Sequence, residues 1–286
     1  MAVFKYSTKG PNLGIAPISY DSQSINLTNT QLRIYFNTLD KVTAQLDNVL
    51  NSNTGGTAIN FPYGAFEDST TQTAPANTAK LISFNTTDYS NGVSLGSRTV
   101  TFTGSRTLTT LTVSGSVGTI YLGMALTGSG VPPNTFITAF LTGTGGDGTY
   151  TTSTSGTIAS TTINGSITSK IIVANAGIYN YQFSLQSENT DTALHDMNIW
   201  TAQNGVYIPG SNGLVSVPNS HGGVNGHSVQ GWNQMIKMAA GDYIEQYWST
   251  DSVLVTIPYY AAGTGPVRPS TPSIAVSLSF VSSIPV

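Results

Sequence analysis

A short stretch near the middle of the chain, SENTDTALHD, carries its densest set of groups that could do chemistry. It contains Glu188, Asp191, His195 and Asp196. Carboxylate and imidazole groups at that density can bind a calcium ion, but their spacing differs from that of the regular calcium-binding loop. A solvated loop between two strands is the simpler interpretation, and we expect no bound metal here.

The glycine-rich segment HGGVNGH is a second candidate, because its polar side chains stand on a flexible backbone. Its candidate recognition residues are His221, Asn225 and His227. On a threefold axis, one histidine from each chain would supply three nitrogen ligands, a set that zinc accepts. Without further ligands in the segment, a loop that contacts a partner is the interpretation that we favour.

The other acidic residues do not form the facing pair that cleavage of a glycan requires. Glu67 and Asp68 are adjacent, and Asp242 and Glu245 differ by an odd step, so in a strand each pair points to opposite faces. The sequence contains no nucleophile elbow, phosphate-binding loop or nucleotide-binding fingerprint, and it has no cysteine. We therefore expect a protein that is not an enzyme and uses no cofactor.

The composition indicates what kind of chain positions these groups. Of 286 residues, 39% are hydrophobic but only 8% are charged, against about 25% charged in an ordinary soluble domain. Serine, threonine, asparagine, glutamine and glycine take the place of the usual charges, and threonine favours strands. An uncharged polar surface of this kind suits secreted, fibrous or virion proteins.

The charge pattern also excludes some partners. The net charge is −3 and the sequence has no cluster of lysine or arginine, so we expect no binding to nucleic acid. The N-terminus lacks the apolar core of a signal peptide, and no segment is apolar for long enough to cross a bilayer. The sequence therefore predicts no membrane insertion and no export signal.

One helix is predicted, after an irregular N-terminal arm over residues 1–27. Thr28 and Gln31 have the spacing of a capping box. The apolar positions that follow alternate in steps of three and four, as in a coiled coil; they are Leu32, Tyr35, Leu39, Val42, Leu46 and Val49. Residues 28–56 are thus expected to form a short trimeric coiled coil and linker, and a helix packed on its own domain is the alternative.

From about Phe61 onward the sequence predicts strands and turns, hence a mainly β fold. Runs of alternating apolar and polar residues are separated by glycine, asparagine and proline. The predicted strands are Phe61–Phe66, Ala79–Phe84, Lys170–Val173, Gly177–Leu185, Met197–Thr201, Val229–Met238, Tyr243–Trp248, Val253–Ile257 and Ser273–Val281.

Residues 98–167 differ in composition, since they consist largely of threonine, serine, glycine and aliphatic residues. The turn-like segments SGVPPNT and GTGGDGT predict a small β-domain of about four to six strands. The text on either side, NTTDYSNGVSLGS and TSKIIVANAGIYNYQFSLQ, joins into one strand-turn-strand passage when this block is removed. We therefore expect an insertion in a loop of a β-sandwich made by residues 57–97 and 168–286.

The order of several segments resembles the C1q/TNF-like jelly-roll domains of bacteriophage structural proteins. The segments are FPYGAFEDSTTQTA, ISFNTTDYSNGVSLG, SKIIVANAGIYNYQFSLQ, AAGDYIEQYWS and PSIAVSLSFV. The inserted block, with GMALTGSGVPPNTFITAFLTGTGGDGTYT, resembles a Gly/Thr-rich module that recurs in phage virion proteins. These resemblances imply a jelly roll that forms a tight trimer, in a protein associated with a fibre or tail.

Two aromatic strands carry the candidate core and subunit interface. In AGIYNYQFSLQ the aromatic residues alternate with polar ones, and AGDYIEQYW has a similar pattern. The candidate residues are Tyr179, Tyr181, Phe183, Tyr243, Tyr247 and Trp248.

These observations predict a phage virion protein, assembled in the host cytoplasm and exposed outside the cell. We expect a homotrimeric tail or head fibre or spike subunit, bound to another virion protein through its N-terminal arm and to a host surface glycan or protein. A capsid decoration or neck protein without receptor binding is the main alternative. A glycan depolymerase and a secreted lectin-like adhesin are the others.

Overall fold

The computed structural model describes residues 30–43 and 61–284. The chain divides into two compact units, Met1–Asn60 and Phe61–Val286. The N-terminal arm, Thr28, Leu46 and Val49 lie outside the described residues, so the predictions made for them stay predictions.

The first unit contributes one helix, over residues 30–43. Leu32, Tyr35, Leu39 and Val42, the predicted seam, are all half-buried along this helix. Ile34 and Phe36, which the seam does not include, are 60% and 55% exposed. The apolar surface of the helix is therefore wider than the predicted stripe.

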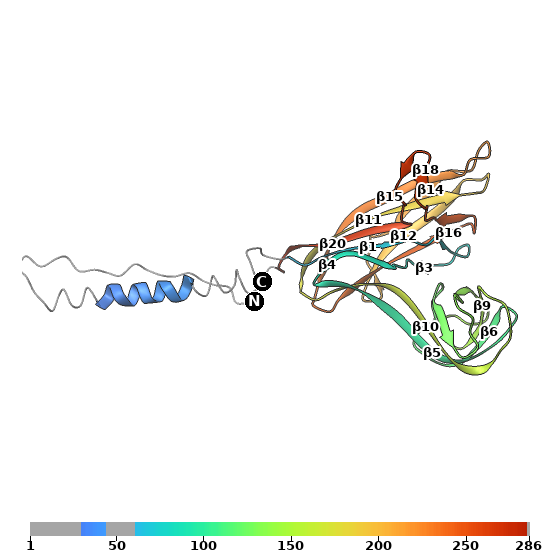
Figure 1. Cartoon of the computed structure of the whole chain (residues 1–286), viewed down its shortest axis with the longest axis horizontal. Helices are drawn as coiled ribbons and strands as arrows, with labels where there is room; N and C mark the ends of the chain where they lie inside the picture. Colours follow the sequence, from blue (N-terminus) through green and yellow to red (C-terminus); the bar gives the residue numbers. More distant parts are fainter. Residues whose placement is uncertain (1–29, 44–60, 285–286) are drawn as a thin grey trace, which may run out of the picture. The chain divides into compact units, whose positions relative to one another are not determined.

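The second unit is built from antiparallel sheets (Figure 1). The first sheet has seven strands. They are β1 (Tyr63–Asp68), β2 (Gln72–Thr73), β4 (Thr86–Asn91), β11 (Gly177–Asn189), β15 (Gly226–Met238), β17 (Val255–Ile257) and β20 (Ile274–Ser282).

The second sheet has eleven strands. They are β3 (Lys80–Leu81), β5 (Val93–Thr107), β6 (Thr110–Val117), β7 (Ala125–Gly128), β8 (Ile137–Phe140), β9 (Gly148–Thr152), β10 (Ile158–Val173), β12 (His195–Gln203), β13 (Val206–Tyr207), β14 (Gly213–Val217) and β16 (Tyr243–Thr250). A separate small hairpin joins β18 (Gly263–Thr264) to β19 (Val267–Arg268).

Four strands of each sheet enclose the main core. Their order is β1-β20-β11-β15 in the first sheet and β10-β16-β12-β14 in the second. The core between them takes side chains from both sheets, such as Leu185 and Val276 from the first and Ile199 and Trp248 from the second. The chain is thus mainly β, and its two sheets pack face to face as in a β-sandwich.

Strand β11 shows why these residues form this structure. Its burial alternates with period two along the whole strand, with Tyr179, Tyr181, Phe183 and Leu185 inside and polar residues between them. Since side chains of a strand point alternately to its two faces, this pattern fixes which face meets the core. The predicted period is therefore present over the full length of β11.

The block at residues 98–167 is connected to the sandwich by two long strands. β5 and β10 pair from Val93 and Val173 at one end to Arg106 and Ile158 at the other, with two register shifts along the way, and they run side by side from the sandwich toward β6 and β9 (Figure 1). The expected boundaries at 98 and 167 fall inside these strands. The block is therefore an extension of the second sheet as well as an insertion.

The inserted block has its own core, but that core also includes side chains of the sandwich. Phe102, Leu111 and Tyr150 are buried in it, together with Leu81 of β3 and Tyr247 of β16. The block thus packs on the outer face of the second sheet.

Several expected strands match in position, but others, including the very short β2, β13, β18 and β19, were not predicted. β4 and β14 have no counterpart among the predicted strands, and only Lys80 and Leu81 of the expected strand Ala79–Phe84 are paired as a strand. Within the described part of the chain, no helix has the length and apolar character needed to cross a membrane.

Candidate functional site

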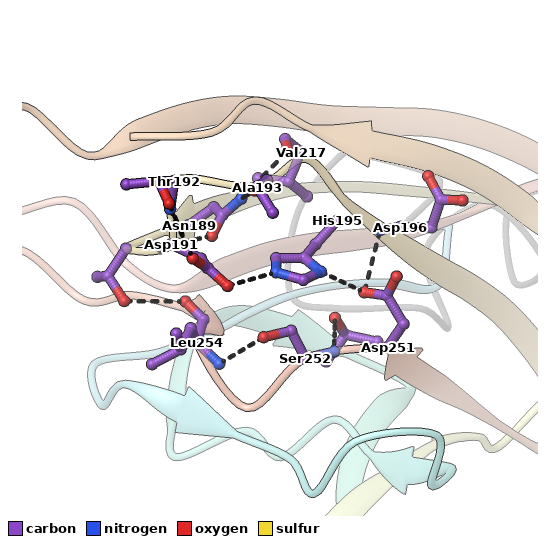
Figure 2. Close-up of polar contacts among 12 residues, drawn as sticks. Asn189, Asp191, Thr192, Ala193, His195, Asp196, Val217, Asp251, Ser252 and Leu254 are labelled. Carbon is purple, nitrogen blue, oxygen red and sulfur yellow. Dashed lines mark hydrogen bonds and ion pairs between the residues drawn. The ribbon is translucent and has the colours of Figure 1, made fainter. Parts of the chain in front are cut away.

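The loop between β11 and β12, within the SENTDTALHD stretch, folds around the side chain of His195 (Figure 2). The Nε2 atom of His195 lies 2.9 Å from Asp191 Oδ2, and its Nδ1 atom lies 3.0 Å from Asp251 Oδ1. Asp191 belongs to the connection between β11 and β12, whereas Asp251 follows β16. The histidine therefore ties together two loops at one end of the sandwich.

Asn189 holds the same loop from inside. Its side chain is fully buried at the end of β11; the Nδ2 atom donates to the carbonyl of Ala193 at 2.8 Å, and Oδ1 accepts from the amide of Asp191 at 2.9 Å. The amide of Thr190 donates to the carbonyl of Leu254 at 3.1 Å. The loop is thus fixed by its own hydrogen bonds, as asparagine turns commonly are, and by a backbone bond to the loop between β16 and β17.

The charges of this cluster stabilise one another. Hydrogen bonding to Asp191, aided by the charge of Asp251, raises the pKa of His195. The same contact lowers the pKa of Asp191. The loop therefore favours a protonated imidazole between two carboxylates.

The four candidate metal ligands of this stretch do not converge. Asp196 accepts a hydrogen bond from Ser216 at 2.7 Å, and Glu188 accepts one from Asn225 at 3.0 Å. Among residues 30–43 and 61–284, no group of three or more histidine or acidic side chains could hold a metal ion. The loop is better described as a polar clamp than as a coordination site.

We expect His195→Gln to lower the melting temperature in a pH-dependent way. Because the pKa of His195 is raised in the folded protein, its stabilising effect is complete below the unfolded value of about 6.5 and is lost as the pH rises through the folded value. Thermal denaturation should show a difference in melting temperature between the wild type and His195→Gln at pH 5.5, and this difference should fall by about half or more at pH 9. An equal difference at both pH values would contradict the clamp.

The candidate recognition residues split into two places. His227 Nδ1 lies 3.2 Å from the hydroxyl of Tyr260, and that hydroxyl donates to Glu188, which also binds Asn225. His221 is exposed at the preceding turn, where its backbone pairs with Val224. The structure thus joins Asn225 and His227 through Glu188 but leaves His221 apart.

Two of the acids considered for glycan cleavage, Asp68 and Asp242, have structural partners. Asp68 is buried and accepts hydrogen bonds from the amide of Thr70 at 2.7 Å and the hydroxyl of Ser83 at 2.9 Å. Asp242 accepts one from Asn204 at 2.7 Å. Glu67 lies on the other face of β1, where burial and the charge of Asp88 raise its pKa.

Glu245 forms a buried ion pair that sequence reasoning missed. Arg98 Nε donates to Glu245 Oε1 at 2.6 Å, and Arg98 Nη2 donates to the second oxygen. The hydroxyl of Ser169 adds a hydrogen bond at 2.9 Å, and the Glu245 side chain has no exposed surface. The guanidinium also lies 4.9 Å from the ring centre of Tyr121, so the pair connects the sandwich to the inserted block.

A cleft of about 650 Å³ separates the inserted block from the sandwich. The sandwich lines it with Thr73, Lys80 and Val253, and the inserted block with Leu122 and Phe136. The Lys80 ammonium donates to the carbonyl of Thr73 at 2.5 Å. Burial lowers the pKa of Lys80 to about 8, although the charge of Asp68 acts in the opposite direction.

We expect Lys80→Met to be more stable relative to the wild type at neutral pH than at alkaline pH. A lysine whose folded pKa is about 8, below the unfolded value of about 10.4, weakens folding at low pH, and this cost disappears between pH 8 and 10.4. The stability of the wild type relative to Lys80→Met should therefore rise from pH 7 to pH 10 in urea titrations. Lys237→Met, at an exposed lysine, is the control and should show no such trend.

A shallow groove of about 360 Å³ lies on the outer face of the second sheet. It is lined by Asn198, Trp200, Tyr207, Ile208, Gly210, Ser211, Asn212 and Ser249, which we call the Trp200 groove. The Trp200 ring stacks on Tyr247 with centroids 5.8 Å apart, and the Tyr207 ring meets Trp200 edge-on at 5.7 Å. The groove thus combines aromatic surface with amides and hydroxyls.

The six aromatic residues singled out from the sequence occupy three environments. Tyr179, Tyr181, Phe183 and Trp248 are buried in the core between the sheets. Tyr247 is buried under the inserted block, beside the Trp200 groove. Tyr243 is half-buried on the outer face, with the Lys170 ammonium 4.5 Å from its ring centre.

Comparison with known proteins gives no identification. No protein-family model matches the chain, and no curated protein matches it.

Proposed function

We propose that this protein is a non-enzymatic structural subunit of a bacteriophage particle, a homotrimeric tail or head fibre or spike that takes part in attachment to the host surface. The observation that carries this proposal is the order of the eight strands that enclose the main core. The low charge of the chain and the resemblance to phage structural proteins support it.

The strand order supports a jelly roll. Counted along the chain, the eight strands are β1, β10, β11, β12, β14, β15, β16 and β20. The first strand pairs with the eighth, the second with the seventh, the third with the sixth and the fourth with the fifth. The sheets then read 1-8-3-6 and 2-7-4-5. Such nested pairing follows when one long antiparallel ribbon wraps into two sheets, which is how a jelly roll is built.

The outer face of the first sheet supports association between copies. On β15 the outward residues Val229 and Met235 are 64% and 62% exposed, and their neighbours on β11 and β20 are uncharged, such as Gln182 and Ser277. Asn180 Oδ1 is buried on this face without a hydrogen-bond partner. Between Lys237 at one end of β15 and Glu188 and His227 at the other, this face presents uncharged polar and exposed aliphatic side chains, which are suited to a subunit interface.

The helix supports the same assembly. Its half-buried stripe at Leu32, Tyr35, Leu39 and Val42 is the seam that a parallel coiled coil would use. A helix of this length is marginal alone in water, so the sandwich must contribute to holding three copies together. In the particle, the N-terminal arm would bind another virion protein.

Three measurements test the proposal. Light scattering of the full chain at micromolar concentration should give the mass of a trimer, and an antibody against the chain should label phage particles in electron micrographs. The full chain, labelled with a fluorescent dye, should also bind host cells. A stable monomer would overturn the fibre assembly, whereas labelled particles whose protein does not bind cells would favour a decoration or neck protein.

A further inference from the structure

We infer that the Trp200 groove is a binding site for a neutral sugar ring, and that it is the surface through which this protein contacts a host glycan. The inference rests on the proposed attachment function and assigns it to a place in the fold. Its basis is the combination of exposed aromatic surface, free amide and hydroxyl groups and the absence of charge from the groove lining.

The aromatic part of the groove is held rigidly. Trp200 and Tyr247 lie opposite each other on paired strands β12 and β16, and their rings are within 12° of parallel. Tyr207 packs edge-on against both, at 5.7 Å and 5.3 Å, yet remains 53% exposed. A preformed aromatic surface loses little conformational entropy on binding and offers an apolar plane to the C–H face of a sugar.

The turn before Tyr207 explains this exposure. Gln203 and Val206 pair across a two-residue turn in which Asn204 and Gly205 have positive φ, 51° and 82°. Asparagine followed by glycine is the preferred sequence for such a tight hairpin. The short hairpin turns β13 back along β12, opposite Ala202, which brings Tyr207 over the ring of Trp200.

The polar part of the groove has unused hydrogen-bonding capacity. Asn212 Nδ2 donates to Asn198 Oδ1 at 3.0 Å, and this contact leaves the amide nitrogen of Asn198 as a donor and the carbonyl of Asn212 as an acceptor. Within the described residues neither of these two atoms, nor the Ser249 hydroxyl, has a hydrogen-bond partner. Trp200 Nε1 is buried without a partner as well. Donors and acceptors beside an aromatic ring match the hydroxyl groups around a sugar.

The charge of the site decides the class of sugar. None of the eight lining residues carries a charged side chain. Glu245, on the same face of β16, is neutralised by its ion pair with Arg98. The acidic group of a charged sugar would therefore lose its hydration on binding without gaining a cationic partner. A neutral hexose or N-acetylhexosamine is thus the expected ligand.

The test is binding of the full chain to an array of neutral and acidic oligosaccharides from bacterial surface polysaccharides. We expect the wild type to bind neutral members, and Tyr207→Ala and Asn212→Ala each to weaken that binding by about tenfold or more, the loss of one stacking or hydrogen-bonding contact. Tyr89→Ala, at a tyrosine of β4 that is 73% exposed, is the matched control and should bind like the wild type.

Three results would overturn the inference. They are binding to no neutral member of the array, preference for acidic members, and equal loss of binding in Tyr207→Ala and Tyr89→Ala. The same proteins applied to host cells separate this inference from the proposed function. Cells bound equally by the wild type and by Tyr207→Ala would refute the groove but keep the attachment function, whereas cells bound by neither protein would refute attachment itself.

Discussion

Replacing Arg98 with methionine should destabilise the protein by about 3–5 kcal/mol, because it leaves the carboxylate of Glu245 buried without a partner. Glu245 has no exposed side-chain surface, whereas 17% of the Arg98 side chain is exposed. Glu245→Leu should therefore cost less than Arg98→Met, since the remaining guanidinium still reaches water and the ring of Tyr121. Urea unfolding at one fixed protein concentration measures both changes.

The double variant Arg98→Met/Glu245→Leu separates the cost of an unpaired buried charge from the cost of lost packing. With both charges removed, stability should return to within about 1 kcal/mol of the wild type, because well-packed apolar residues often replace a buried ion pair without cost. Arg268→Met, at an exposed arginine of β19, is the control and should change stability by less than about 0.5 kcal/mol. Additive losses in the double variant would contradict this account.

Replacing Met235 with glutamate should convert the proposed trimer to monomers at micromolar concentration. The substitution places a carboxylate among the uncharged side chains around Met235, two positions from Lys237, and three copies would bring three such carboxylates into one interface. The cost of such contacts is several kcal/mol, or an association more than about 100-fold weaker. Light scattering gives the mass, and circular dichroism checks that the strands remain folded.

Leu214→Glu is the matched control for this experiment. Leu214 is 63% exposed, almost the same as the 62% of Met235, but it lies on β14 of the other sheet. We expect it to leave the mass of the assembly unchanged. If Met235→Glu is folded and still trimeric, the subunit interface lies elsewhere.

Features with a local period were predictable from the sequence. The alternation along β11 follows from residues next to one another, so its buried face could be predicted without knowing its neighbours. The strand-turn-strand passage on which the predicted insertion was based has a counterpart in the structure, since its two texts cover β4 and β5 on one side and β10 and β11 on the other, and β5 pairs with β10. The short strand β14 gave no signal because only Val217 of its five residues is fully buried.

The candidate site depended on contacts that no local pattern contains. Arg98 and Glu245 are 147 positions apart, and the three rings at the Trp200 groove come from β12, β13 and β16. Only the register of these strands places them together. Only one of the two contacts of His195 is local in the sequence, because Asp191 is four residues away whereas Asp251 belongs to another loop.

The long pairing of β5 with β10 has a mechanical consequence for the inserted block. A force that pulls the inserted block away from the sandwich acts along these strands, from Arg106 and Ile158 toward Val93 and Val173. Both strands are joined covalently to the block at one end and to the sandwich at the other, so their two backbones carry this load in parallel, and the hydrogen bonds between the strands hold them side by side. Tension on the inserted block would then reach the second sheet through a two-stranded ribbon, with no flexible linker between them.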